Sequence, residues 1–104
     1  MGVMLNEDRW AVINFTYNPA AVAAATTVEQ TVTIPGLRPG DYLGELTKPT
    51  LTAGVCVVNT RVSAADTLAI TWANVTAGSI DPPAETYSLY VMRPEKVQVG
   101  SFSV

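Results

Sequence analysis

The sequence predicts an all-β domain, a single antiparallel β-sandwich of about seven short strands with an extended N-terminal arm. Apolar and polar residues alternate along several separate runs, so one face of each run can pack against a core. Turn-forming Gly, Pro, Asn and Asp residues separate these runs, which recur roughly every ten residues. At 104 residues the chain has the size of one domain. Residues 1–104 are therefore expected to form one sandwich, with residues 1–9 as its arm.

Alternation is clearest in the first two expected strands, 10–17 and 28–34. The first has two distinct faces, one with Ala11, Ile13, Phe15 and Tyr17, the other with Trp10, Val12, Asn14 and Thr16. The second has Val28, Val32 and Ile34 on one side and stops at Pro35-Gly36, which opens a tight corner over residues 35–41. Further strands are expected at 41–47, 55–63, 67–73, 86–93 and 97–104.

The connections between these runs fit a β-sandwich and offer little helix. Residues 63–66 form a compact turn, and residues 76–85 form a loop that Pro82-Pro83 stiffens. The one helical candidate is 19–25, where Asn18 is a possible cap. That run is short and turns into strand pattern at Thr26, so we expect an extended segment with at most one helical turn. The sandwich is then immunoglobulin-like or jelly-roll in style, without the Cys…Trp…Cys pattern of antibody domains.

Charge is scarce in this chain. Apolar residues make up 48% and charged residues only 14%, against roughly 25% charged in a typical domain. Thirteen threonines supply part of the missing polarity and also suit strands. The remaining deficit predicts that part of the surface is covered by a partner or by identical copies.

The charge balance argues against two classes of partner. The net charge is −3, and the six basic residues are scattered singly, whereas binding to nucleic acid needs clustered Lys and Arg. An anionic membrane surface is disfavoured for the same reason. The first ten residues lack the pattern of a secretory signal, and no apolar run approaches the roughly 18 residues of a membrane span. We therefore expect synthesis in a cytoplasm and no membrane.

The residues needed for catalysis are mostly missing. Histidine is absent, which removes the commonest general base and the commonest zinc ligand. Cys56, the one cysteine, lies in the apolar run GVCVV and is predicted to be a small buried hydrophobe. Asp41, Asp66 and Asp81 lie in or beside turns, where carboxylates usually cap backbone. We expect no enzyme, no cofactor and no metal site; a carboxylate pair and a loop-bound calcium ion are the alternatives left open.

The aromatic residues divide between core and surface. Trp72 is in phase with Leu68 and Ile70 and is predicted to be in the core, while Tyr87 and Tyr90 should point to opposite faces of their strand. Trp10 is either part of a frayed terminus or part of an arm that docks on a neighbouring subunit. Two glycosylation sequons, at Asn14 and Asn74, are expected by chance in a Thr-rich chain, and Asn74 is expected to help end its strand.

A series of turn motifs follows the expected strands: a Thr/Val strand ending in Pro-Gly at 32–36, a Gly-Asp step at 40–41, Val-Ser-Ala-Ala-Asp-Thr at 62–67, and Asn-Val-Thr-Ala-Gly at 74–78. With this series, residues 15–94 resemble small β-rich structural proteins of tailed bacteriophages. Similar modules occur in head decoration (cement) proteins, head fibres and tail-associated proteins. The resemblance implies a component of a virion, made in the host cytoplasm, and leaves its position in the particle open.

Our interpretation is a capsid decoration protein that binds the outer surface of the phage head as a small oligomer and stabilises it. Its partners would be the major capsid protein and other copies of itself, with no nucleic acid. The expected interface residues are Met4, Leu5 and Trp10 in the arm, and Arg38 and Tyr42 near the stiff corner. The alternative is a tail or fibre module that binds host-surface carbohydrate, which several exposed aromatics on one face would favour.

Overall fold

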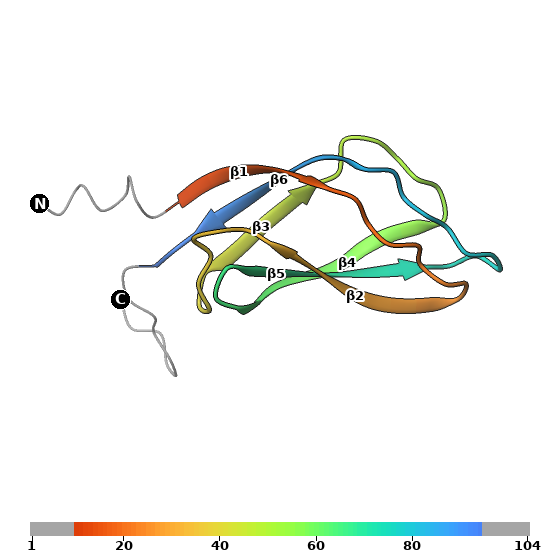
Figure 1. Cartoon of the computed structure of the whole chain (residues 1–104), viewed down its shortest axis with the longest axis horizontal. Coiled ribbons are helices and arrows are strands. Elements are labelled where there is room, and N and C mark those ends of the chain that lie inside the picture. The colour runs from red at the N-terminus through yellow and green to blue at the C-terminus, as the bar shows by residue number, and fades with distance from the viewer. Residues whose placement is uncertain (1–9, 95–104) are drawn as a thin grey trace, which may run out of the picture.

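The computed structural model describes residues 10–94, which form two three-stranded antiparallel sheets (Figure 1). Within this range the chain contains six strands and no helix. They are β1 (Trp10–Tyr17), β2 (Thr26–Thr33), β3 (Tyr42–Thr47), β4 (Val55–Ala64), β5 (Thr67–Asn74) and β6 (Glu85–Met92). The prediction of an all-β, antiparallel, sandwich-like fold is confirmed. The predicted seventh strand at 97–104 and the arm at 1–9 lie outside the described residues.

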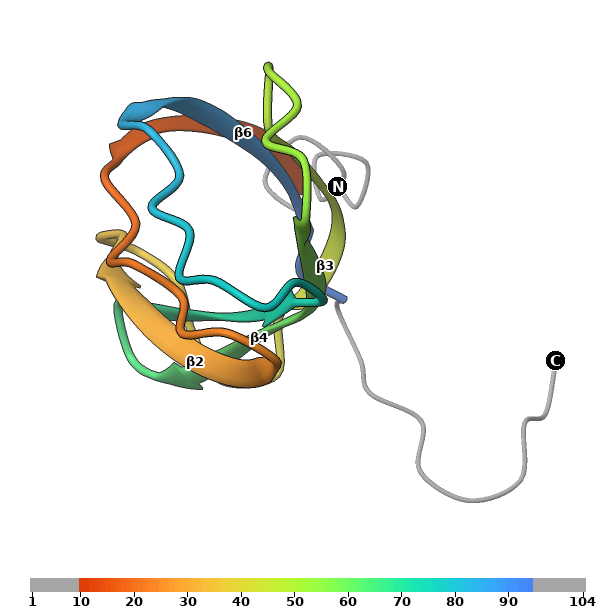
Figure 2. The same cartoon turned by 90° about the vertical axis from the view of Figure 1, so that its right-hand side faces the viewer.

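The two sheets have the strand orders β1-β6-β3 and β2-β5-β4. In an immunoglobulin domain, strands B-E-D pair in one sheet and C-F in the other. When β2–β6 are equated with B–F, all of these pairings are present. The difference is β1, which joins β6 antiparallel in the position that strand G takes in an immunoglobulin domain. In Figure 2, seen from one end, the two sheets face each other, with β3 beside β4.

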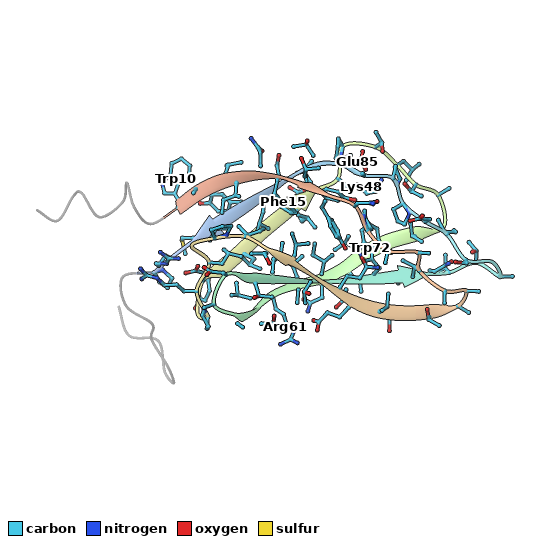
Figure 3. The ribbon with its side chains drawn as sticks, in the orientation of Figure 1. Trp10, Phe15, Lys48, Arg61, Trp72 and Glu85 are labelled. Atoms are coloured by element: carbon cyan, nitrogen blue, oxygen red, sulfur yellow. The ribbon has the colours of Figure 1, made fainter. Side chains whose placement is uncertain are left out.

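The core lies between the inner faces of the sheets, where strand alternation delivers one residue in two. Leu68, Ile70 and Trp72 from β5 meet Tyr87 and Leu89 from β6, and all five are fully buried. Complete burial of a large apolar side chain contributes roughly 1.5–3 kcal/mol, so this group is a main source of stability. Trp72 is confirmed as a core residue, and Figure 3 shows it and Phe15 between the sheets.

A hydrogen-bonded chain joins the sheets inside this core. The indole Nε1 of Trp72 donates to the hydroxyl of Tyr17 at 3.1 Å, and that hydroxyl donates to Oε1 of Gln30. The Gln30 side chain also bonds both backbone groups of Ala20, in the connection between β1 and β2. Burial raises the pKa of Tyr17, because ionisation would leave a charge in an apolar setting.

At one end of the sandwich, Asn74 joins the connection between β1 and β2 to the connection between β5 and β6 by hydrogen bonds. Residues 19–25 contain no helix: Val22 forms an isolated antiparallel bridge with Ile80, and Ala24-Ala25 form a turn in which Ala25 has a φ of 52°. The buried amide of Asn74 donates to the carbonyls of Val22 and Gly78 at 2.9 Å each. Its Oδ1 accepts from the backbone N–H of Thr76 at 2.8 Å. Asn74 therefore ends β5 as expected, and both the nitrogen and the oxygen of its buried amide form hydrogen bonds within the protein.

At the other end, the predicted stiff corner packs on the β4–β5 hairpin. Asp66, at the hairpin tip, has a φ of 61° and accepts from the N–H of Gly36 through Oδ1 at 2.8 Å. Its backbone also bonds Ile34 and Leu37. The corner thus has a fixed position relative to the sheet β2-β5-β4.

The prediction that Cys56 is buried is wrong, because its side chain is exposed. Cys56 lies opposite Ala73 on the outer face of its sheet, while its neighbours Val55 and Val57 pack against the core. A run of consecutive apolar residues hides strand parity, so sequence alone did not show which residues face outward. Val58, which follows the inward-facing Val57, is exposed as well.

Candidate functional site

The outer face of the sheet β1-β6-β3 carries an exposed group of aromatic and apolar side chains. We call it the aromatic face, and its members are Trp10, Val12, Tyr42, Tyr90 and Met92. The exposed fractions are 55% for Trp10, 58% for Val12, 54% for Tyr42 and 40% for Tyr90. A group of this kind on a small domain is typical of an interaction surface.

Strand register brings these residues together from three distant parts of the sequence. Trp10 lies opposite Met92, and Met92 lies opposite Tyr42 on its other side, so the three form one row across the sheet. In the next outward-facing row, Val12 lies opposite Tyr90. The rings of Trp10 and Tyr90 are diagonal neighbours, with centroids 6.1 Å apart and planes tilted by 38°.

A bulge in β3 makes room for the ring of Tyr90. Leu43 pairs with Val91 and Leu46 with Leu89, so Gly44 and Glu45 together oppose Tyr90. A Cβ at Gly44 would lie 2.6 Å from Cδ2 of Tyr90, closer than nonbonded carbon atoms approach. Tyr90 therefore lies against the backbone of β3, which only glycine at position 44 allows in this conformation.

The aromatic face ends in polar residues further along the strands. Ser88 donates to Oδ1 of Asn14 at 2.6 Å, one step beyond the Val12–Tyr90 row. Aromatic centre and polar margin together match the anatomy of many protein interfaces, in which Tyr, Trp and Met are enriched at the centre.

The structure brings two of the five predicted interface residues together. Trp10 and Tyr42 share the aromatic face, although they are 32 positions apart in the sequence. Arg38 is exposed in the corner, where its backbone N–H bonds Asp41. Met4 and Leu5 lie outside the described residues.

Sequence reasoning did not assign Val12 or Tyr90 to the interface. Alternation placed Val12 on the same side as Trp10, and it placed Tyr90 opposite in phase to Tyr87. Alternation does not show which strands are neighbours, so it could not show that β6 lies between β1 and β3 and brings these residues together.

Four carboxylates are engaged in structural contacts. Both carboxylate oxygens of Asp41 accept hydrogen bonds from the guanidinium of Arg93, at 2.7 Å each. The carboxylate of Asp66 accepts a hydrogen bond from the backbone N–H of Gly36 in the corner. Glu29 pairs with Arg61, and Glu85 pairs with Lys48. The adjacent cation lowers the pKa of Asp41, Glu29 and Glu85 in each case. Asp41, Glu29 and Glu85 therefore stabilise loops and strands in their ionised form.

In residues 10–94 no three His, Cys, Asp or Glu side chains come close enough to hold a metal ion.

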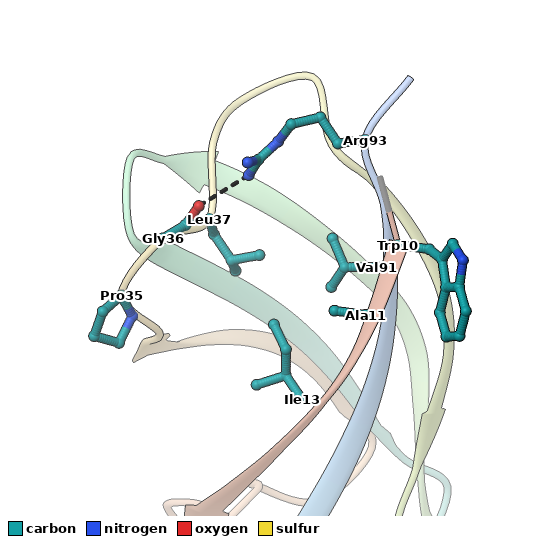
Figure 4. A pocket seen from close by; sticks show the side chains of 8 residues that line it. All are labelled: Trp10, Ala11, Ile13, Pro35, Gly36, Leu37, Val91 and Arg93. Atoms are coloured by element: carbon teal, nitrogen blue, oxygen red, sulfur yellow. Dashed lines mark hydrogen bonds between the residues drawn. The ribbon is translucent and has the colours of Figure 1, made fainter. Parts of the chain in front are cut away.

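A small apolar cavity of about 190 Å³ opens at the end of the sandwich between β1 and the corner. Ala11, Ile13, Leu37 and Val91 point into it (Figure 4). Arg93 lies at its rim and donates to the carbonyl of Gly36 at 2.9 Å. The ring of Trp10 lies on the opposite side of β1, on the aromatic face.

Comparison of the chain with protein-family models, with curated proteins and with solved structures found no match. In the described part of the chain, no helix has the length and apolar character needed to cross a membrane.

Proposed function

We propose that this chain is a non-enzymatic structural protein of a phage particle, which binds the outer surface of the head through its aromatic face and stabilises the shell. The observation that carries the proposal is the aromatic face. It contains two of the interface residues that the sequence predicted. Tyr42 lies within residues 15–94, the segment that resembles phage structural proteins, and Trp10 lies just before that segment. The low charge of the whole chain, 14%, also supports a surface adapted to association.

The mechanism is thermodynamic. A protein that binds only the assembled lattice lowers the free energy of that state and opposes its opening by mass action. Many copies with modest individual affinity add their contributions when they bind one lattice. The protein itself needs no catalytic group for this role, only a rigid scaffold and a complementary surface.

The rigid scaffold is present under the aromatic face. Tyr87, Leu89 and Val91 alternate with the outward residues of β6 and are buried in the core. Binding through such a preformed face avoids much of the conformational entropy that a mobile loop would lose.

The test is binding of purified protein to heads that lack it. We expect Tyr42→Ala and Tyr90→Ala each to weaken binding about tenfold or more, because truncation of a central aromatic typically costs 1–2 kcal/mol or more. Leu51→Ala and Val58→Ala are matched controls, since both residues are exposed and apolar but lie elsewhere. Binding that is equally sensitive to all four substitutions, or to none, would contradict this use of the aromatic face.

The position in the particle is a separate measurement. Cryo-electron microscopy of purified virions should show many copies on the head surface. A few copies at one vertex, or density on the tail, would overturn the assignment to head decoration.

Carbohydrate binding is the second candidate, favoured by the three aromatic rings on one face. Sugar rings stack on aromatic side chains, and Tyr42, Tyr90 and Trp10 are all accessible. The 38° tilt between Trp10 and Tyr90 means that these two rings do not form one plane. Binding to a glycan array that Tyr90→Ala abolishes, with no binding to heads, would support this candidate in place of decoration.

A further inference from the structure

Among the described residues, the outer edge of strand β1 pairs with no other strand and lacks the usual protection against strand addition. Its one hydrogen-bonded strand neighbour in the described structure is β6, and the register between them is unbroken over all eight residues. The sequence WAVINFTY contains no charge, no proline and no glycine. A long, regular and uncharged edge is a template for strand addition.

The other three edge strands are protected. β3 is interrupted by the bulge at Gly44-Glu45, and β4 has two register shifts. Along β2, Glu29 forms an ion pair with Arg61, and Gln30 bonds the crossing segment at Ala20. The contrast shows that edge protection is present in this fold and is missing from β1.

The apolar cavity lies beside this same edge. Ala11 and Ile13 of β1 form one wall and the corner at Leu37 forms another. An added strand would offer its backbone to β1 and its inward side chains to this space. This is the arrangement found in recognition by strand addition, in which main-chain bonds give affinity and pockets take alternate side chains.

We propose that the occupant of this edge is β1 of a second copy, so that two sheets join as one continuous six-stranded sheet in a symmetric dimer. An antiparallel pair of identical strands has two-fold symmetry, which makes the interface self-complementary. Absence of charge matters here, because a charged residue near the axis would meet its own copy. Each β1 meets this condition along its whole length.

Strand geometry restricts the position of the two-fold axis of this dimer. Residues that face each other across an antiparallel pair point to the same side of the sheet, so their numbers have the same parity. One residue must then lie opposite its own copy, with the two-fold axis midway between the two. The strands overlap most when this residue is Ile13 or Asn14. In the first case Val12 lies opposite Asn14 of the other copy; in the second, Asn14 lies opposite itself.

This dimer goes beyond the proposed function, since it holds whether or not the partner is a phage head. It would place two aromatic faces on the same side of one sheet. Their simultaneous engagement with a lattice would raise avidity without any new contact.

The first experiment measures the mass of the full chain in solution by sedimentation equilibrium, with no other component. The wild type should have the mass of a dimer, and Val12→Lys should be a monomer, because it puts two like charges close to the axis. Val58→Lys is the matched control. Its exposed fraction is 54%, against 58% for Val12, and it lies on β4. Circular dichroism and thermal unfolding establish that both variants are folded.

A monomeric wild type at the highest soluble concentration overturns the proposal. So does a wild-type mass of three chains, or a Val12→Lys variant that stays as dimeric as Val58→Lys. None of these outcomes depends on binding to heads, so failure of the dimer and failure of the proposed function are distinguishable.

The second experiment locates the interface by disulfide formation. In a Cys56→Ser background, oxidation of a mixture of Val12→Cys and Asn14→Cys proteins should give covalent dimers, since directly opposed Cβ atoms lie about 4.5–5.5 Å apart. Thr31→Cys, an exposed position on the β2 edge, should stay monomeric under the same conditions. Crosslinking through Thr31→Cys alone, or no crosslinking at all, contradicts pairing of β1 with β1.

Discussion

Tyr87 lies at the centre of the aromatic group in the core, and its hydroxyl is buried. Its ring stacks on Phe15 at a centroid distance of 5.9 Å and meets Tyr17 at 5.2 Å. No atom in the described part of the protein forms a hydrogen bond with this hydroxyl. Burial, with a smaller contribution from Glu85, raises the pKa of Tyr87 to about 12. The ring contributes to the core, whereas the hydroxyl is desolvated without compensation.

Tyr87→Phe should therefore stabilise the protein. Removal of a buried hydroxyl that has no partner relieves a desolvation cost of roughly 1 kcal/mol or more. Urea denaturation would measure this as a higher midpoint with an unchanged slope. Tyr17→Phe is the control with the opposite sign, because the Tyr17 hydroxyl bonds both Trp72 and Gln30. It should cost about 1–2 kcal/mol. Equal destabilisation by both variants would show that the Tyr87 hydroxyl has a partner.

Gly44 is the residue on which the position of Tyr90 depends. Gly44→Ala would introduce a Cβ 2.6 Å from the ring of Tyr90, so the ring must move outward. We expect a loss of about 1 kcal/mol, at the low end for overpacking because Tyr90 is partly exposed and can shift. In a Tyr90→Ala background the same substitution should cost much less. Denaturation of the four proteins in this cycle measures the coupling, and strictly additive effects would contradict the proposed contact.

At the scale of elements, Asp66 connects the β4–β5 hairpin to the corner. It adopts a positive φ, which Asn and Asp tolerate better than most residues, and its carboxylate accepts from Gly36. Asp66→Ala loses both advantages and should cost about 2 kcal/mol. Asp66→Asn keeps an acceptor oxygen and the tolerance for positive φ, so it should stay within about 0.5 kcal/mol of the wild type. Thermal unfolding compares the two; similar losses for Ala and Asn would mean that the carboxylate charge is what matters.

Alternation of polar and apolar residues was sufficient to predict where the strands lie, but it did not predict which strands pair. It placed Trp72 in the core, and it placed Tyr87 and Tyr90 on opposite faces of their strand without showing which face is buried; in the structure Tyr87 is inside and Tyr90 outside. It failed for Cys56, where consecutive apolar residues carry no parity signal. Helix was rightly rejected for residues 19–25, since a short run next to a strand cannot offset the cost of helix nucleation.

At the scale of the whole molecule, the candidate site depends on topology that no local pattern contains. Trp10 and Tyr42 share a face only because β6 lies between β1 and β3. This pairing joins residues that are about 40 to 80 positions apart, and it is set by packing of the complete core. Alternation could therefore give the side of each strand on which a residue lies, but it could not give the neighbours.

Three ion pairs connect separate segments of the molecule and make its stability depend on acid pH. The carboxyls of Asp41, Glu29 and Glu85 all have a pKa below the ordinary values of 3.8 for Asp and 4.5 for Glu. A lowered pKa in the folded state adds stability above the pKa of the unfolded chain. That stability is lost as the pH falls through the folded value. The urea midpoint should accordingly be flat near neutral pH and fall below about pH 4.5.

The three carboxylates should contribute unequally to this acid sensitivity. The side chain of Asp41 is 2% exposed and that of Glu85 is 12% exposed, whereas that of Glu29 is 34% exposed and its partner Arg61 is 57% exposed. Solvent screens the exposed pair, so Glu29→Gln should leave the difference in midpoint between pH 7 and pH 3 almost unchanged. Asp41→Asn should reduce that difference most, because Asp41 pairs with Arg93 and also accepts from the backbone of Arg38. If Glu29→Gln reduced the difference as much as Asp41→Asn, acid sensitivity would reflect the net charge of the chain and not the buried ion pair.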